Sequence, residues 1–318
     1  MEQEHVVPVV QGSSNAQNND DGDSETAEAA AKPCSNSICS RHDDKSMSID
    51  YTQNWSKTIP FHADAVQFPT SVKEVMDIVK NPRYNSIKAF GSRHCFNAIA
   101  DTKDSSKTSS DGTSHTDCSV HLGMEQLTQI WIHDHDDTAP KGPTVTLQAG
   151  VTFTQLMPVL TKAGLALTNM PSLPHISVVG GIITGTHGSG MGHHILAKYV
   201  VGMELVHADG TLVTYDKYTT PNFDHYLLSL GALGIIVSVT LEVESTYHVA
   251  KGIYVDLPWQ EFLNHIDDLL FEPPAEFVSV FMDLKAPRMN SVWIGKKYWP
   301  HNNDDNNTAP AIAATCYS

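Results

Sequence analysis

The fold of this 318-residue chain is decided by one stretch, Gly91-Ser92-Arg93-His94-Cys95-Phe96-Asn97. The four residues before it, Ile87-Lys88-Ala89-Phe90, predict a strand, because Ile87 is β-branched and Phe90 is aromatic. His94 is therefore expected on a loop that leaves a strand end, where reactive side chains are often displayed. A lone loop histidine is more often structural than functional, so this interpretation needs support from elsewhere in the chain.

That support comes from a second unusual segment, residues 169–190. It contains Gly180-Gly181 and the pattern Gly185-x-x-Gly188-x-Gly190. Closely spaced glycines let backbone N–H groups approach a phosphate, and they tolerate positive φ. A backbone cradle of this kind and the imidazole of His94 would form two walls of one site. The pair suggests a flavin that is held by a covalent bond.

Two alternatives exist for the glycine segment. The dinucleotide-binding fingerprint G-x-G-x-x-G needs a strand before it, a helix after it and an acidic residue about twenty positions on. Here Pro171 and Pro174 come first, no clean amphipathic helix follows, and the order of the glycines differs. The other alternative is a purely structural glycine loop, which the segment alone does not exclude.

Two other groups of histidines have the residue types of metal ligands but not the arrangement that a metal site needs. His193-His194 and His133-Asp134-His135-Asp136 lack a third well-placed ligand and an evident set of supporting groups. Solvated loops explain them, and we expect no metal.

Most of the net charge of −16 lies in the two ends of the chain. Residues 1–50 carry ten acidic and three basic side chains, and residues 300–318 carry two acidic ones, so −9 of the −16 is terminal. The middle is only mildly acidic, and no nucleic-acid partner is expected. Residues 1–50 are polar and without apolar periodicity, which predicts a disordered acidic head. We find no secretory leader pattern and no membrane-spanning apolar stretch, which favours a cytoplasmic location.

Local patterns predict a mixed α+β chain. Capping-box patterns at Ser71–Glu74 and Thr152–Gln155 open two helices, the second with Pro158 inside it. Alternating apolar residues predict strands, among others at 201–207, at 212–214 and at 235–243. Hairpins mixed with isolated helices favour α+β over a doubly wound parallel sheet. A new unit begins near residue 250 and ends in an Asn/Asp-rich stretch, as if truncated.

Several strings resemble, in this order, those of the vanillyl-alcohol-oxidase-type FAD-linked oxidases. The resemblance covers about residues 54–300 and is closest to the alditol (xylitol) oxidases, with the sugar-1,4-lactone oxidases as relatives. The strings that carry it are Asn54-Trp55, Gly91-Ser92-x-His94-x-Phe96-Asn97, Gly164-Leu165-Ala166-Leu167-x-Asn169-Met170, Ser172-Leu173-Pro174-His175-Ile176-Ser177-Val178, Thr184-Gly185-Thr186-His187-Gly188-Ser189-Gly190 and Ser229-Leu230-Gly231-Ala232-Leu233-Gly234.

The resemblance implies a domain order. After the head at 1–50, residues 51–246 would form a two-subdomain FAD-binding fold of the vanillyl-alcohol-oxidase (PCMH) type. Residues 247–318 would begin an α+β substrate (cap) domain that is truncated.

The resemblance also implies FAD, bound covalently through His94 to its 8α-methyl group. The residues implied to bind FAD are Ala89, Phe90, Gly91, Ser92, Arg93, His94, Cys95, Ser172, Ser177, Gly180, Ile183, Thr184, Gly185, Thr186 and Ile236. Ser172 would also bind the substrate. Arg93 and Cys95 depart from the commoner Gly and Ser around the histidine. The catalytic side chains would lie in the missing C-terminal part, so none is assigned.

The implied activity is oxidation of the terminal CH–OH of an alditol such as xylitol or sorbitol. Dioxygen would be the acceptor, and the products would be an aldose and hydrogen peroxide. One alternative is a sugar-1,4-lactone oxidase of the gulono- or arabinono-lactone type. Another is a flavin-binding fragment without turnover. The expected partners are the polyol or lactone and dioxygen, with no nucleic acid and no membrane span.

Overall fold

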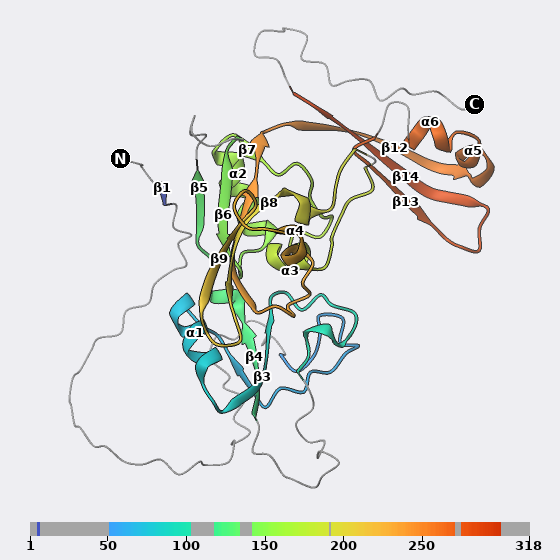
Figure 1. Ribbon diagram of the computed structural model, residues 1–318. Helices are drawn as coiled ribbons and strands as arrows, with labels where there is room; N and C mark the ends of the chain where they lie inside the picture. The colour runs from blue at the N-terminus through green and yellow to red at the C-terminus, as the bar shows by residue number, and fades with distance from the viewer. Residues whose placement is uncertain are drawn as a thin grey trace, which may run out of the picture.

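The computed structural model describes residues 5–6, 51–102, 118–133, 142–190, 192–270 and 275–299. Figure 1 shows a small sheet at the bottom, a larger sheet in the centre and a long three-stranded sheet at the upper right. Together with the helices this is the mixed α+β architecture that the sequence predicts. The predicted head and the 300–318 end fall outside the described residues, apart from the two-residue strand β1 (His5–Val6).

The small sheet is parallel and carries one helix. Its strands are β2 (Ala65–Gln67), β4 (Cys118–Gly123) and β3 (Tyr84–Phe90), in that spatial order. Helix α1 (Val72–Lys80) begins as predicted at Ser71, whose hydroxyl accepts from the N–H of Glu74 at 3.2 Å. The Glu74 carboxylate instead accepts from the N–H and hydroxyl of Thr70, so only half of the expected capping box forms.

Strand β4 buries a histidine that has no hydrogen-bond partner among the described residues. The His121 side chain is 0% exposed, and the rings of Phe61 and Phe90 meet it edge-on at 5.1 and 5.6 Å. An Asp101 oxygen lies 3.6 Å from its Nε2, but that carboxylate is also paired with His62. Burial lowers the pKa of His121 from its ordinary 6.5 to about 4, although Asp101 opposes the shift.

Stability is therefore expected to fall as the pH drops from 6.5 to about 4. Over that range the unfolded chain binds a proton at His121 and the folded chain does not, which costs up to roughly 3 kcal/mol of folding free energy. Urea unfolding at pH 7.5 and pH 4.5 measures the loss. His121→Leu should show a smaller loss than the wild type, and the exposed His225→Leu should match the wild type. Equal losses in the wild type and His121→Leu would contradict this assignment.

The central sheet is antiparallel. Its strands run in the order β1, β5 (Ile130–His133), β6 (Thr144–Gln148), β10 (Ile235–Glu242), β8 (Val200–Val206) and β9 (Leu212–Asp216). A short pair, β7 (Leu165–Ala166) with β11 (Glu244–Ser245), lies beside it. The alternation at 201–207, 212–214 and 235–243 thus predicted three strands correctly, and the structure places all three in this sheet.

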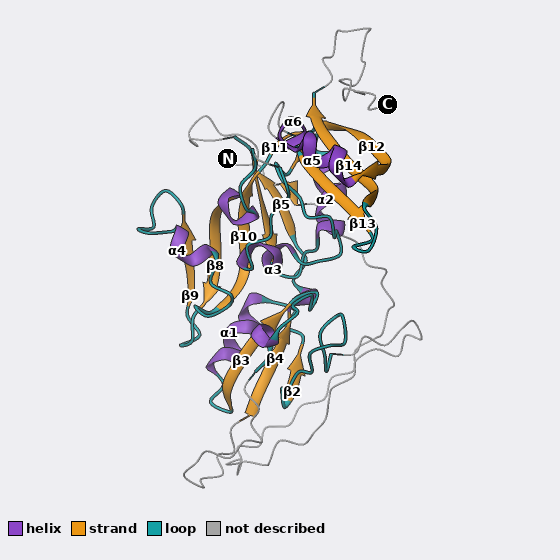
Figure 2. Cartoon of the chain, turned by 90° about the vertical axis from the view of Figure 1, so that its right-hand side faces the viewer, coloured by secondary structure: helices purple, strands orange, loops and turns teal. Residues whose placement is uncertain are grey.

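Three helices accompany this sheet: α2 (Phe153–Lys162), α3 (Val178–Ile183) and the single-turn α4 (Asp224–Leu227). The complete capping box of Thr152 and Gln155 starts α2, as the sequence predicts. Helix α3 packs against β10 in the middle of the molecule (Figure 2). Phe153 of α2 and Ile182 of α3 enter the same core as the sheet residues.

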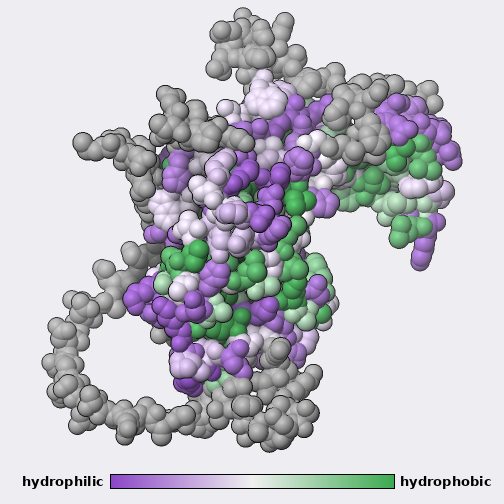
Figure 3. All heavy atoms as spheres, in the orientation of Figure 1, coloured by the Kyte–Doolittle hydropathy of each residue, from purple (hydrophilic) through white to green (hydrophobic). Residues whose placement is uncertain are grey.

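The third unit follows from residue 248. Strands β12 (His248–Pro258), β14 (Arg288–Tyr298) and β13 (Phe277–Met282) form an antiparallel sheet in that order, with α5 (Trp259–Asn264) and α6 (Ile266–Leu270) beside it. It has its own small core around Met289 and Val292. Figure 3 shows hydrophobic residues exposed along this unit as well as over the middle of the molecule. The predicted division at residues 246 and 247 stays a prediction.

None of the helices in the described residues has the length and apolarity that crossing a membrane requires.

Candidate functional site

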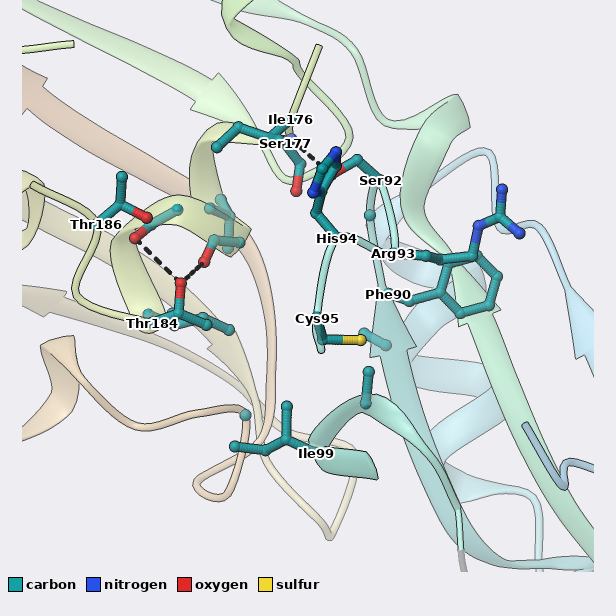
Figure 4. Close-up of a pocket in the computed structure, with 18 of the residues that line it drawn as sticks. Phe90, Ser92, Arg93, His94, Cys95, Ile99, Ile176, Ser177, Thr184 and Thr186 are labelled. Carbon is teal, nitrogen blue, oxygen red and sulfur yellow. Dashed lines mark hydrogen bonds between the residues drawn. The ribbon is translucent and has the colours of Figure 1, made fainter. Parts of the chain in front are cut away.

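A cavity of about 720 Å³ lies where the small sheet meets α3 and the turn before β10. Figure 4 shows its two main walls, the loop that follows β3 and the segment that carries α3. Of the fifteen residues predicted to bind FAD, fourteen line this cavity: Ala89, Phe90, Gly91, Ser92, Arg93, His94, Cys95, Ser172, Ser177, Gly180, Ile183, Thr184, Thr186 and Ile236. Gly185 is the exception. It occupies the left-handed region, with φ of +71°, at the end of α3.

Some lining residues were not predicted. Leu230, Gly231 and Gly234 come from the turn before β10, Ile235 begins that strand, and Ile99 comes from a short 3-10 turn. The glycines of residues 229–234 mark this turn in the sequence, but they were taken only as part of the family resemblance and not as cavity residues. Ile99 carried no signal. Both groups add apolar surface to the cavity.

Gly91 lets one cavity wall approach the other at Ser177, and Gly180 leaves room for the same side chain within its own wall. A Cβ on Gly91 would overlap Oγ of Ser177 and lie 2.6 Å from its Cβ, and a Cβ on Gly180 would lie 2.6 Å from the same Oγ. The N–H of Ser177 donates to Oγ of Ser92 at 3.2 Å, which joins the walls directly. The result is a backbone cradle that side chains at these positions would fill, with the hydroxyls of Ser92, Ser177 and Thr184 around it. Such a surface fits a pyrophosphate.

His94 stands on the cavity wall with its ring held on two sides. The Trp55 ring stacks on it at 4.2 Å and 21°, and Nε2 of His175 lies 2.7 Å from its own Nε2. Burial, and then the neighbouring His175, lower the pKa of His94 below its ordinary 6.5. Its imidazole is therefore neutral near pH 7, as a nitrogen nucleophile must be.

The side chain of Arg93 is directed away from the cavity (Figure 4). Its guanidinium donates to the carbonyl of Gln53 at 3.3 Å and lies over the Tyr51 ring at 4.8 Å. The backbone of Arg93 is in the left-handed region, with φ of +57°. Arg93 thus lines the cavity with its backbone, and its side chain ties the loop to residues 51–53.

Residues 91–97, here called the histidine loop, are held in place by Asn54, which is buried at 2% exposure. Its Oδ1 accepts from the N–H groups of Thr58 and Ile59 at 2.8 and 3.0 Å, and its Nδ2 donates to the carbonyl of Cys95 at 2.8 Å. The N–H of Trp55 also donates to the carbonyl of Arg93 at 2.9 Å. In the sequence, Asn54 and Trp55 contribute to the family resemblance, and neither was predicted to hold this loop.

Asn54→Ala is expected to lower the free energy of unfolding by about 2–3 kcal/mol, because it leaves buried backbone groups unpaired. Chemical denaturation measures the change. Asn85→Ala, at an exposed position in β3, should cost less than about 0.5 kcal/mol. If the two variants unfold at the same denaturant concentration, the hydrogen bonds of Asn54 do not stabilise the histidine loop.

The loop after α3 ties the cavity to the three-stranded sheet. Oγ of Ser189 donates to the carbonyl of Val278 and accepts from its N–H, both at 2.8 Å. His193 pairs with the carboxylate of Glu276. Across the described residues, no group of three or more His, Cys, Asp or Glu side chains is arranged to hold a metal ion. Residues 134–136 of the other histidine group lie outside the described ranges.

Comparisons with known proteins agree with this geometry. Residues 63–216 match the family model described as "FAD binding domain". The alditol oxidase of a Streptomyces strain is 34% identical over 244 residues, which are 77% of this chain and 53% of that protein. The L-gulonolactone oxidase of Mus musculus is 31% identical, covering 76% of this chain and 53% of that protein. The chain therefore spans about half the length of these curated relatives.

Solved structures support the fold. Cholesterol oxidase from B. sterolicum superimposes with a TM-score of 0.62 at 21% identity, covering 77% of this chain and 47% of that one. A solvent-stable cholesterol oxidase gives 0.59 at 22% identity, covering 76% and 47%. With the matched domain and the cavity, these likenesses confirm the predicted fold class and cofactor. The chain thus contains an FAD binding domain with the vanillyl-alcohol-oxidase-type (PCMH) fold, and its cofactor is FAD.

Proposed function

We propose that the protein is an FAD-dependent oxidase that acts on the terminal CH–OH of an alditol such as xylitol or sorbitol. Dioxygen is the electron acceptor, and the products are an aldose and hydrogen peroxide. The observation that carries the proposal is the cavity lined by His94 together with thirteen other residues that were predicted to bind FAD. The similarity to an alditol oxidase supports the choice of substrate. Bound FAD supplies the two-electron acceptor that no side chain can provide.

In this proposal the two walls of the cavity bind different parts of FAD. Backbone N–H groups around Gly91 and Gly180, with the nearby hydroxyls, bind the pyrophosphate. Ile183 would give apolar surface along the flavin, and Ile236 would give it on the adenine side of FAD. His94 would bond covalently to the 8α carbon of FAD, and this link would prevent loss of the cofactor. Ser172 lines the cavity and is exposed, so its hydroxyl can bind a substrate hydroxyl.

A sugar-1,4-lactone oxidase is the second candidate. The mouse L-gulonolactone oxidase and the D-arabinono-1,4-lactone oxidase of Candida albicans are 31% and 29% identical to the chain, values close to that of the alditol oxidase. Both reactions oxidise a CH–OH group, so the same cavity would serve either one.

Peroxide release by the FAD-loaded chain tests the proposal. Xylitol and sorbitol should give peroxide faster than L-gulono-1,4-lactone or D-arabinono-1,4-lactone at equal concentration. Faster turnover of the lactones would replace the alditol proposal by the second candidate. If neither class gives peroxide and anaerobic polyol leaves the flavin absorbance unchanged, the chain binds flavin without turnover.

A further inference from the structure

His175 contacts His94 and has no role in the function proposed above. Their Nε2 atoms are 2.7 Å apart, and the ring centroids are 4.8 Å apart. Two imidazole nitrogens reach this distance when one carries a proton and the other offers its lone pair. The contact therefore requires an Nε2–H on one ring and an Nε2 lone pair on the other.

The position of His175 is set by the backbone on both sides of it. The carbonyl of Pro174 accepts from the N–H of Thr154 at 2.7 Å and from its hydroxyl at 2.9 Å. The carbonyl of Ile176 accepts from the N–H of Phe153 at 3.2 Å. His175 is thus attached to the first turn of α2, a rigid element, although its own side chain is exposed.

The two histidines differ in their relation to the cavity. His94 lines it and is half-buried, whereas His175 is exposed to solvent and does not line it. The Nε2 edge of His94 is therefore occupied from outside the cavity. Its Nδ1 has no hydrogen-bond partner in the part of the chain that the structure describes. A neutral imidazole carries one proton, so a proton on Nε2 leaves the lone pair on Nδ1.

We propose that His175 is a positioning residue for His94 during covalent attachment of FAD. Its Nε2 accepts the Nε2–H of His94, which presents the Nδ1 lone pair to the 8α carbon and then removes the proton. This inference rests on the covalent link in the proposed function. The lowered pKa of His94 is consistent with it, because the imidazole of His94 is then neutral and carries a single ring proton.

The atoms and electrons of the step balance. A bond forms between Nδ1 of His94 and the 8α carbon, while one C–H bond of the methyl group and the Nε2–H bond of His94 break. Both hydrogens leave as protons, and the methyl proton passes to water. The two electrons pass to the isoalloxazine and on to dioxygen, which takes two protons and becomes hydrogen peroxide. His175 receives the Nε2 proton from His94 and, being exposed, releases it to water.

The test follows covalent flavin in time after FAD is added to the apoprotein in air. Samples are precipitated with acid and washed, and the flavin fluorescence of the polypeptide is read. His175→Ala should slow this attachment on the order of 100-fold, the size of a typical proton-transfer contribution. FAD affinity before precipitation should stay within about threefold of the wild type. Imidazole added to the buffer should restore part of the rate, which a merely structural role would not allow. The exposed His225→Ala is the matched control and should react at the wild-type rate.

Two results would overturn this inference and leave the proposed covalent link intact. One is attachment by His175→Ala at the wild-type rate. The other is slow attachment that imidazole does not speed, accompanied by weakened FAD affinity. A wild-type protein that binds FAD but never retains it after acid would instead refute the covalent link itself, and this inference with it.

Discussion

Gly91→Ala is expected to weaken FAD binding about 100-fold. A Cβ at this position would overlap Oγ of Ser177 and lie 2.6 Å from its Cβ, closer than real side chains approach. Either the histidine loop or the start of α3 must then shift, and both line the cavity. Overpacking of this kind costs roughly 1–3 kcal/mol, and 2.7 kcal/mol corresponds to the stated factor. Titration of the apoprotein with FAD, followed by flavin fluorescence, measures the affinity.

Two further variants make this prediction specific. Ser177→Gly removes both atoms that the new Cβ would meet, so Gly91→Ala should weaken binding much less in that background than alone. Gly192→Ala is the matched control, because a Cβ there has no heavy atom within 4 Å. If Gly91→Ala and Gly192→Ala bind FAD equally well, the close approach of the two walls does not shape the site.

His94→Ala is expected to abolish covalently bound flavin while leaving FAD bound non-covalently. The cavity walls keep their backbone and hydroxyl groups in this variant, so the flavin still enters. Cys95, the neighbouring nucleophile, does not replace the histidine, because burial raises the pKa of its thiol and keeps it protonated at neutral pH. Fluorescence of the acid-precipitated polypeptide should fall to background, with His225→Ala retaining the wild-type signal. Flavin that stays on the His94→Ala polypeptide would show that another residue is the attachment point.

The elements predicted correctly are those whose signals are local. Helix α2 has a capping box and helical spacing, and β10 alternates apolar and polar residues over most of its length. Strand β4 was missed because Ser119 and His121 interrupt its apolar character, and only its place between two parallel strands explains its burial. Helix α3 contains Gly180 and Gly181, which disfavour helix by intrinsic propensity, so its sequence suggested a loop. Packing against β10 overrides that preference.

The cavity walls were predictable for the same reason, because glycines and a histidine stand close together in two short runs. What holds the walls was not predictable. Asn54 reaches the Cys95 carbonyl 41 positions away, and His175 reaches His94 across 81 positions. No periodicity or spacing in the sequence encodes such side-chain pairs, which depend on how the loops are folded.

Peptide mass spectrometry tests the central claim, that His94 faces FAD inside this cavity, most directly. Trypsin cleaves after Arg93 and Lys103, so the peptide 94–103 begins with His94. In protein loaded with FAD, this peptide is expected to carry the added mass of FAD less two hydrogen atoms, with fragment ions placing it on His94. An unmodified 94–103 peptide from folded protein, with the flavin attached elsewhere or removed by acid, would contradict it.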